Sequence, residues 1–176
     1  TKVILIGICD INKDTKKISP KNISFFTRIE KAVLDVRPDA IILCTPPFKR
    51  MQDLKICAKY KLPVLVEKPL AVNLKEAINL VNFMSHKKLL LFVGLNFRYL
   101  PVTSEKIKLI NSKKVGKPNF SKFIYERWRD GTLERLNKYP LYMKQPMLWE
   151  QSIHHFDLIR YIFKSNVKNV FAITSN

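Results

Sequence analysis

Short apolar runs alternate with stretches of helical spacing through the first half of the chain. The runs are nearly continuous in Val, Ile, Leu and Cys, and most end at a polar or turn-forming residue. We predict strands at 3–9, 23–26, 40–44, 63–66 and 89–94, and helices at 29–36, 51–60 and 74–84. Apolar strands separated by helices are typical of a parallel sheet covered on both faces. The pattern therefore predicts an α/β fold.

The pattern changes after Gly94. We predict in turn a helix, a longer strand, a second helix and the start of a further strand: 102–110, 119–128, 148–163 and 167–174. The longer strand alternates apolar and polar side chains, which indicates an antiparallel sheet with one wetter face. We therefore expect a parallel α/β domain over 1–98, then the start of an α+β domain with a mainly antiparallel sheet over 99–176.

Composition is compatible with a folded cytoplasmic protein. The 176 residues are 47% hydrophobic, enough for a sizeable core, and no apolar run is long enough for a membrane span. The opening Thr1-Lys2 leads directly into the first predicted strand, so we read no signal peptide. Cys9, Cys44 and Cys57 form no CxxC pair and fit no zinc spacing. We expect buried, reduced thiols and no metal site.

The net charge of +18 raises the alternative of nucleic-acid binding. The lysines are scattered in short pairs such as Lys16-Lys17, Lys87-Lys88 and Lys113-Lys114, with no basic arm or recognition helix. This distribution favours a solvated lysine-rich surface that would also attract an anionic cofactor. We therefore expect neither a nucleic-acid nor a membrane partner.

Asp10 stands at the end of the first predicted strand. In dinucleotide-binding folds an acid at such a strand end binds the ribose hydroxyls and disfavours the 2′-phosphate of NADP. Alternatively, Asp10 is an ordinary turn or helix-capping residue. The chain has only four glycines and no G-x-G-x-x-G. Either a phosphate-binding unit of about 30 residues belongs before Thr1, or the fold is not of this class.

Glu67-Lys68-Pro69 ends another buried strand. Open α/β sheets bind ligands at the carboxyl ends of their strands, so Lys68 would face the crevice. Pro69 restricts the backbone there and helps to aim the ammonium group. A lysine in such a place can exchange protons with an alcohol or carbonyl oxygen. The alternative is a surface Glu-Lys pair in a loop.

Glu150 and His154 are four residues apart in the helix predicted at 148–163, so both side chains project to one side. A carboxylate there would orient the imidazole and raise its basicity. Asp157 lies near His154, one turn further on. The alternative for the His154-His155 pair is one packed and one exposed histidine.

Four ordered motifs carry a family resemblance. They are Asp39 to Pro47 with its Thr-Pro turn, Leu65-Val66-Glu67-Lys68-Pro69-Leu70, Val93-Gly94-Leu95-Asn96-Phe97-Arg98-Tyr99, and Glu150 to Arg160 with its histidine and aspartate. Together they resemble the glucose-fructose oxidoreductase / inositol dehydrogenase / MocA family. The chain departs from the family pattern in four places: Glu150 for a more frequent Asp, Ser152 for Gly, Lys144-Gln145-Pro146 for a glycine-rich run, and Arg50 near the place of a frequent histidine.

The resemblance implies a Rossmann-like domain without its first βα unit, followed by the start of a substrate domain. It implies reversible oxidation of a secondary alcohol on a sugar, cyclitol or polyol, with NAD as cofactor and NADP as the alternative. Lys68 and His154 would share acid–base work, assisted by Glu150. The cofactor would contact Asp10, Thr45, Pro46, Glu67, Lys68, Asn96 and Arg98. The substrate would contact Tyr125, Arg127, Trp128 and His155. Family members often pair, so the resemblance also implies a homo-oligomer.

Two alternatives remain open at this point. The chain could be a relative that binds the dinucleotide without turning substrate over, although both Lys68 and His154 are present. It could also be an inactive remnant, because the first strand of this fold is central to the sheet and carries phosphate binding. For the 176 residues alone we expect little activity and poor solubility.

Overall fold

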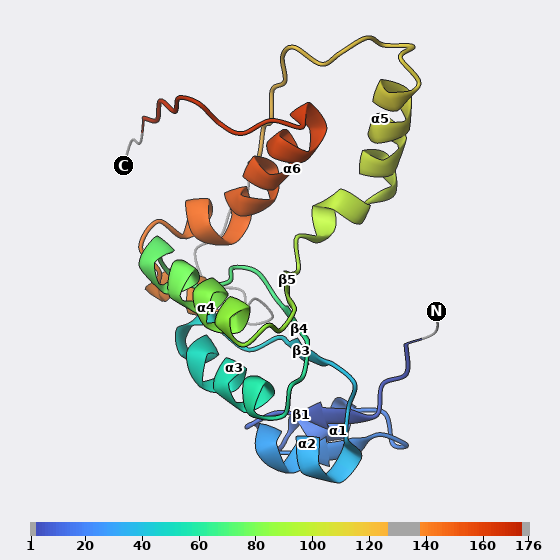
Figure 1. Cartoon of the computed structure of the whole chain (residues 1–176), viewed down its shortest axis with the longest axis vertical. Helices are drawn as coiled ribbons and strands as arrows, with labels where there is room; N and C mark the ends of the chain where they lie inside the picture. The colour runs from blue at the N-terminus through green and yellow to red at the C-terminus, as the bar shows by residue number, and fades with distance from the viewer. Residues whose placement is uncertain (1–2, 127–137, 174–176) are drawn as a thin grey trace. The chain divides into compact units, whose positions relative to one another are not determined.

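A computed structural model of the chain describes residues 3–126 and 138–173 (Figure 1). The residues pack into two compact units, Thr1–Gly94 and Leu95–Asn176. The break between the units falls a few residues before the domain boundary that we placed near residue 98. Each unit is described by itself.

The first unit contains two parallel sheets. In one, β1 (Gly7–Cys9) pairs with β2 (Ser24–Phe26). In the other, the order is β3 (Ile41–Leu43), β4 (Val64–Val66) and β5 (Leu91–Val93). The register of the second sheet places Leu43 beside Val66 and Val66 beside Val93. The predicted α/β class with parallel pairing is therefore confirmed for this unit.

Helices follow the strands in alternation, as predicted. They are α1 (Thr15–Ile18), α2 (Ile29–Val36), the 3-10 turn η1 (Pro47–Lys49), α3 (Arg50–Lys59) and α4 (Leu74–His86). Asn73 caps α4, since its side chain accepts a hydrogen bond from the backbone of Glu76 at 2.9 Å. Leu80 and Met84, four residues apart in α4, are both buried, which is the spacing of a helix with one apolar side.

The core of this unit lies on one face of the three-stranded sheet. Val64 and Val66 of β4 pack in one cluster with Leu54 of α3 and Leu80 of α4. On the opposite face, Ile42, Leu65 and Phe92 form an in-register row that is 61%, 40% and 56% exposed. We expected cover on both faces, and this was wrong for the described residues, because α3 and α4 both pack on the same face.

The first predicted strand is shorter than expected. Only Gly7–Cys9 pairs with a neighbour, and the preceding side chains, from Val3 to Ile6, are exposed. An apolar run becomes a strand only where another backbone satisfies its hydrogen bonds. In the described residues β2 supplies these partners for Gly7–Cys9 and no further.

The regular elements described in the second unit are all helical. Its elements are η2 (Asn96–Tyr99), α5 (Pro101–Asn111), η3 (Tyr139–Tyr142), the π-helical turn η4 (Met147–Ser152) and α6 (Ile153–Phe163). Pro101 stands at the first position of α5, where its missing N–H is harmless. Residues 119–126 and 167–173, which we predicted as strands, form no strand among the described residues. The antiparallel sheet therefore stays a prediction.

Basic residues close most of the longer helices in the left-handed conformation that glycine usually adopts. The positive-φ positions at or just after helix ends are Arg37, Lys61, Lys88, Lys113 and Lys164. At Arg37, the backbone N–H donates to the carbonyl of Val33 at 3.0 Å and closes the last turn of α2. The glycine-poor chain thus ends its helices with charged side chains.

Candidate functional site

Five predicted cofactor residues follow strands of the first unit. Asp10 comes directly after β1, and Thr45 and Pro46 lie just beyond β3. Glu67 and Lys68 come directly after β4. Parallel strands end at a common edge, and open α/β sheets bind ligands in the crevice outside that edge. These five residues therefore lie at strand ends, as the sequence predicted, and their contact with a cofactor stays a prediction.

The carboxylate of Asp10 holds the loop that follows it. Its Oδ1 accepts from the backbone N–H of Asn12 at 2.8 Å, and its Oδ2 accepts from the hydroxyl of Thr15 at 3.1 Å. These contacts are of the turn-forming kind that we kept open as the alternative role. A carboxylate has about four acceptor sites, so the same oxygens retain capacity for ribose hydroxyls. Ribose binding by Asp10 stays a prediction.

Asp53 is an acidic residue of this region that we did not predict. It lies in the first turn of α3, is half-buried, and accepts from the hydroxyl of Thr45 at 3.1 Å. Burial raises the pKa of Asp53, while the Thr45 hydroxyl and the Arg50 guanidinium oppose the rise. Burial, Asp10 and Asp53 together raise the pKa of Cys9. An acid in the first turn of a helix that follows a strand end was the available signal.

Glu67 and Lys68 come directly after β4, and the Glu67 carboxylate lies against Gly94, just after β5. The Oε2 of Glu67 accepts from the backbone N–H of Lys68 at 3.2 Å. At Gly94, an added Cβ would lie 3.3 Å from Glu67 Oε1 and 3.4 Å from the carbonyl oxygen of Val66. Glycine therefore allows the Glu67 carboxylate to lie against the backbone of residue 94. A carboxylate held there can accept hydrogen bonds from the hydroxyl and amide groups of a dinucleotide.

In the second unit, His154 is packed within the protein. Its ring stacks on Phe97 of η2, with centroids 4.0 Å apart and planes at 8°. His154 is 4% exposed and Glu150 is 7% exposed. We predicted one α-helix through both residues, and this was wrong, because Glu150 lies in the π-helical turn before α6. π-helical turns are frequent at functional sites.

Arg98 is engaged by Asp157 of α6. Its Nε donates to Asp157 Oδ2 at 2.6 Å, and its Nη2 donates to Oδ1 at 2.5 Å. This bidentate pair raises the pKa of Arg98. Within the second unit, Arg98 therefore links η2 to α6, which the expected cofactor role did not anticipate. Asn96, on the same turn, is exposed.

His155 lies among aromatic rings. The ring centroids of Phe97, Phe123 and Tyr125 are 5.9, 5.9 and 5.3 Å from that of His155. The hydroxyl of Tyr125 donates to Gln151 Oε1 at 2.9 Å, and the side-chain amide of Gln151 donates to Glu150 Oε2. Two of the predicted substrate residues, Tyr125 and His155, therefore lie together, and Gln151 links Tyr125 to Glu150. The other two, Arg127 and Trp128, lie outside the described residues.

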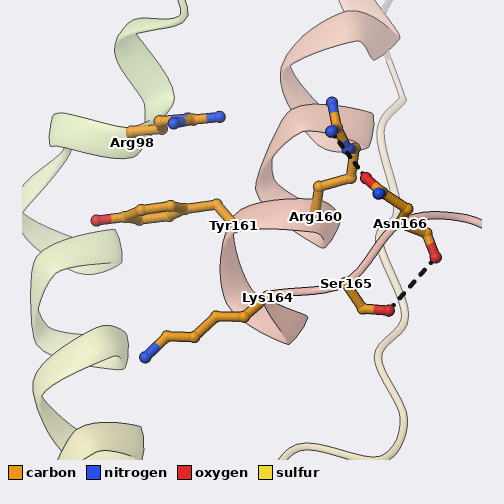
Figure 2. A pocket seen from close by; sticks show the side chains of 6 residues that line it. All are labelled: Arg98, Arg160, Tyr161, Lys164, Ser165 and Asn166. Atoms are coloured by element: carbon orange, nitrogen blue, oxygen red, sulfur yellow. Dashed lines mark hydrogen bonds between the residues drawn. The ribbon is translucent and has the colours of Figure 1, made fainter.

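A basic hollow of about 330 Å³ lies in the second unit, at the end of α6 (Figure 2). The Arg98 guanidinium stands over the ring of Tyr161, with Cζ 5.0 Å from the ring centroid. Arg160 points away from them and donates to Asn166 Oδ1 at 2.9 Å. The remaining lining residues are Lys164 and Ser165. Arg98 is the one predicted site residue in this hollow.

The cysteines differ from the prediction in part. Cys57 is buried in α3, and burial raises its pKa to about 12. Cys9 and Cys44 are exposed, which corrects our expectation of three buried thiols. Both stand at the carboxyl ends of strands, where the sheet gives way to loops.

Across 3–126 and 138–173, no group of three or more His, Cys, Asp or Glu side chains is arranged to hold a metal ion. Over the same residues, no helix combines the length and the apolar character needed to cross a membrane.

Comparison with known proteins gives a consistent result. A family model described as an oxidoreductase family with an NAD-binding Rossmann fold matches residues 2–95 of the 176. The myo-inositol 2-dehydrogenase of Thermotoga maritima is 24% identical over 96% of the chain. The chain spans about half the length of that relative, 50%.

Solved structures share the fold. A probable dehydrogenase from Thermotoga maritima superposes with a TM-score of 0.73 at 20% identity, covering 94% of this chain and 50% of the other. An oxidoreductase from Agrobacterium radiobacter, solved with NAD+, L-tartaric acid and magnesium, gives a TM-score of 0.67 at 20% identity. It covers 89% of this chain and 46% of the other. The likeness extends the parallel α/β assignment to a Rossmann-like fold.

Proposed function

The chain belongs to the glucose-fructose oxidoreductase / inositol dehydrogenase / MocA family of oxidoreductases with an NAD-binding Rossmann fold, and we propose from this that it is part of a polyol dehydrogenase. The substrate would be a sugar, cyclitol or related polyol carrying a secondary alcohol. The myo-inositol 2-dehydrogenase among its relatives supports this substrate class. The observation that carries the proposal is Lys68, which follows the carboxyl end of β4 directly after Glu67, the residue whose carboxylate lies against Gly94.

The strand ends of the first unit would hold the dinucleotide. Asp10 would accept from the ribose hydroxyls, and its negative charge favours NAD over NADP. Thr45, Pro46 and Glu67 would line the remainder of the binding edge. When bound, the nicotinamide accepts or returns the hydride. Asn96 and Arg98 stay proposed cofactor contacts, although Arg98 already binds Asp157.

Proton transfer is proposed for Lys68 Nζ and the imidazole of His154. A group that takes the hydroxyl proton as the hydride leaves carbon raises the rate by about 10²–10⁴. Within the second unit, burial and the stack on Phe97 restrict the orientation of the His154 ring. Glu150, which is also buried, would favour the protonated imidazole. Tyr125, His155, Arg127 and Trp128 stay the proposed substrate contacts.

We further propose that the whole protein is a homo-oligomer with a mainly antiparallel sheet in its second domain.

The test measures turnover of a panel of polyols by the whole protein with NAD or NADP. The reaction is monitored by the absorbance of the reduced cofactor. Lys68→Met should lower kcat by about 10²–10⁴ and leave binding of reduced cofactor, measured by its fluorescence, largely intact. Lys75→Met, an exposed lysine of α4, is the matched control and should keep wild-type kcat.

A double variant extends the test to His154. If Lys68 and His154 serve one chemical step, their losses in kcat will not multiply when Lys68→Met and His154→Asn are combined. Cofactor binding without turnover of any polyol would identify a non-catalytic relative and overturn the proposal. An unchanged kcat in Lys68→Met would remove Lys68 from the chemistry.

A further inference from the structure

Arg50 is a buried arginine at the start of α3, only 1% exposed. Its Nη1 donates to the carbonyl oxygen of Glu67 at 2.6 Å, and its Nη2 donates to that of Thr45 at 2.7 Å. Arginine is seldom fully buried unless its donors are used. The guanidinium thus joins the segment that follows β3 to the segment that follows β4.

Pro69 explains why a side chain is needed at this point. The ladder between β3 and β4 ends with the N–H of Glu67 donating to Leu43 O at 2.8 Å. If the register continued, Thr45 would stand opposite Lys68, and Thr45 O would accept from the N–H of residue 69. That residue is proline, which has no N–H. The donor that Thr45 O receives is instead Nη2 of Arg50.

The second contact bears on Lys68. The Glu67 carbonyl belongs to the peptide that joins Glu67 to Lys68, so Nη1 of Arg50 holds the backbone from which the Lys68 side chain departs. We propose that Arg50 is a positioning residue for Lys68. The two N–H donors that its guanidinium presents, here called the Arg50 fork, replace the ladder hydrogen bond that Pro69 cannot make. They hold the backbone of Lys68 beside the turn at Thr45. The inference rests on the proposed role of Lys68 in proton transfer, and Arg50 acts through Lys68 without touching the substrate.

The chemistry of the fork makes this role specific to arginine. A guanidinium presents several N–H donors in one rigid plane, whereas a neutral imidazole has a single N–H and could satisfy one of the two carbonyls. The family that the sequence resembles frequently has histidine near this position. The arrangement with two donors is therefore a feature of this chain rather than one carried over from the resemblance.

The kinetic test compares Arg50→Met, which has no donor, with Arg50→Lys, which keeps the charge and a donor group. In the whole protein, Arg50→Met should lower kcat by about a hundredfold, as expected for a reactive group displaced by about 1 Å, with a much smaller change in KM for NAD. Arg50→Lys should recover part of the loss. Arg28→Met, an exposed arginine just before α2, is the matched control and should leave kcat unchanged.

The Lys68→Met background separates positioning from a general structural role. There, Arg50→Met should lower the residual kcat no further, because the group that it positions is gone. A second loss of the same size would overturn the inference. If Arg50→Met does not fold, the same comparison is made with Arg50→Lys.

Amide hydrogen exchange tests the fork without any turnover. Peptides covering 43–49 and 64–72 should exchange faster in Arg50→Met and Arg50→Lys than in wild type, while peptides of α4 keep their rate. Unchanged exchange in both peptides would refute the link, even in an active enzyme. If wild type oxidises no polyol while the exchange difference appears, the proposed function fails and the fork itself stands.

Discussion

Asp157→Asn should loosen η2 from α6 in the second unit, because it weakens both contacts that Asp157 makes with Arg98. The asparagine keeps the size of the side chain but turns an NH2 group towards one of the two N–H donors of Arg98. Breaking a buried ion pair by changing one partner costs about 3–5 kcal/mol. Here the Arg98 side chain is 36% exposed, so water can solvate the released guanidinium. We therefore expect a loss of about 2 kcal/mol in the free energy of unfolding.

The assay is urea unfolding of the whole protein, with hydrogen exchange of peptides from α6 to locate the effect. Asp35→Asn is the matched control, because Asp35 forms an exposed helical pair with Lys31, 2.8 Å apart. Such pairs contribute about 0.3–0.5 kcal/mol. Equal losses in the two variants would show that the Arg98 contacts stabilise no more than an exposed helical pair does, and unchanged exchange in α6 of Asp157→Asn would equally refute the reasoning.

Two further predictions concern the first unit. Leu80→Ala should lower the free energy of unfolding by about 2–5 kcal/mol, since Leu80 is 0% exposed in the core. Leu74→Ala, at the exposed start of the same helix, should lower the free energy of unfolding by less than about 0.5 kcal/mol. Urea unfolding of both variants measures the difference. Burial raises the pKa of Cys57 from 9.0 to about 12, so the thiol stays protonated in the folded protein after the unfolded chain has ionised. The free energy of unfolding should therefore be unaffected below pH 9.0 and fall as the pH rises towards about 12. Cys57→Ala should make this alkaline fall less steep. An equally steep fall in the variant would exclude Cys57 as its cause.

Much of the first unit could be predicted from sequence because its signals are local. Leu80 and Met84 show the helical spacing of a buried face, and the strands end at polar residues such as Glu67. The exposure of the side chains from Val3 to Ile6, and of the row through Leu65 on the open face of the three-stranded sheet, could not be predicted from the sequence pattern. Whether an apolar segment is covered depends on which other element packs against it, and a periodicity carries no information about the partner.

In the candidate site, too, the features that depend on local sequence were predicted and those that depend on distant residues were not. The position of Lys68 follows from the strand-end rule, which needs only a strand and the residue after it. The contact between Arg98 and Asp157 joins residues 59 positions apart, so no local pattern contains it. The π-helical turn at Glu150 was missed because the spacing from Glu150 to His154 is equally compatible with an unbroken α-helix. Arg50 was visible only as a departure from a family pattern, and its use depends on the proline at residue 69.

The lysines and the arginine that have a left-handed backbone conformation at the helix ends make this fold less stable than it could be. A side chain in that conformation carries about 1 kcal/mol or more of backbone strain that glycine would not, and the structure places such residues after α2, α3, α4, α5 and α6. In return, each of these basic residues stands at the negative end of its helix macrodipole. Glycine in place of Arg37, Lys61 and Lys88 would therefore stabilise the first unit from the segments before β3, β4 and β5, at the opposite end of those strands from Thr45, Glu67 and Gly94.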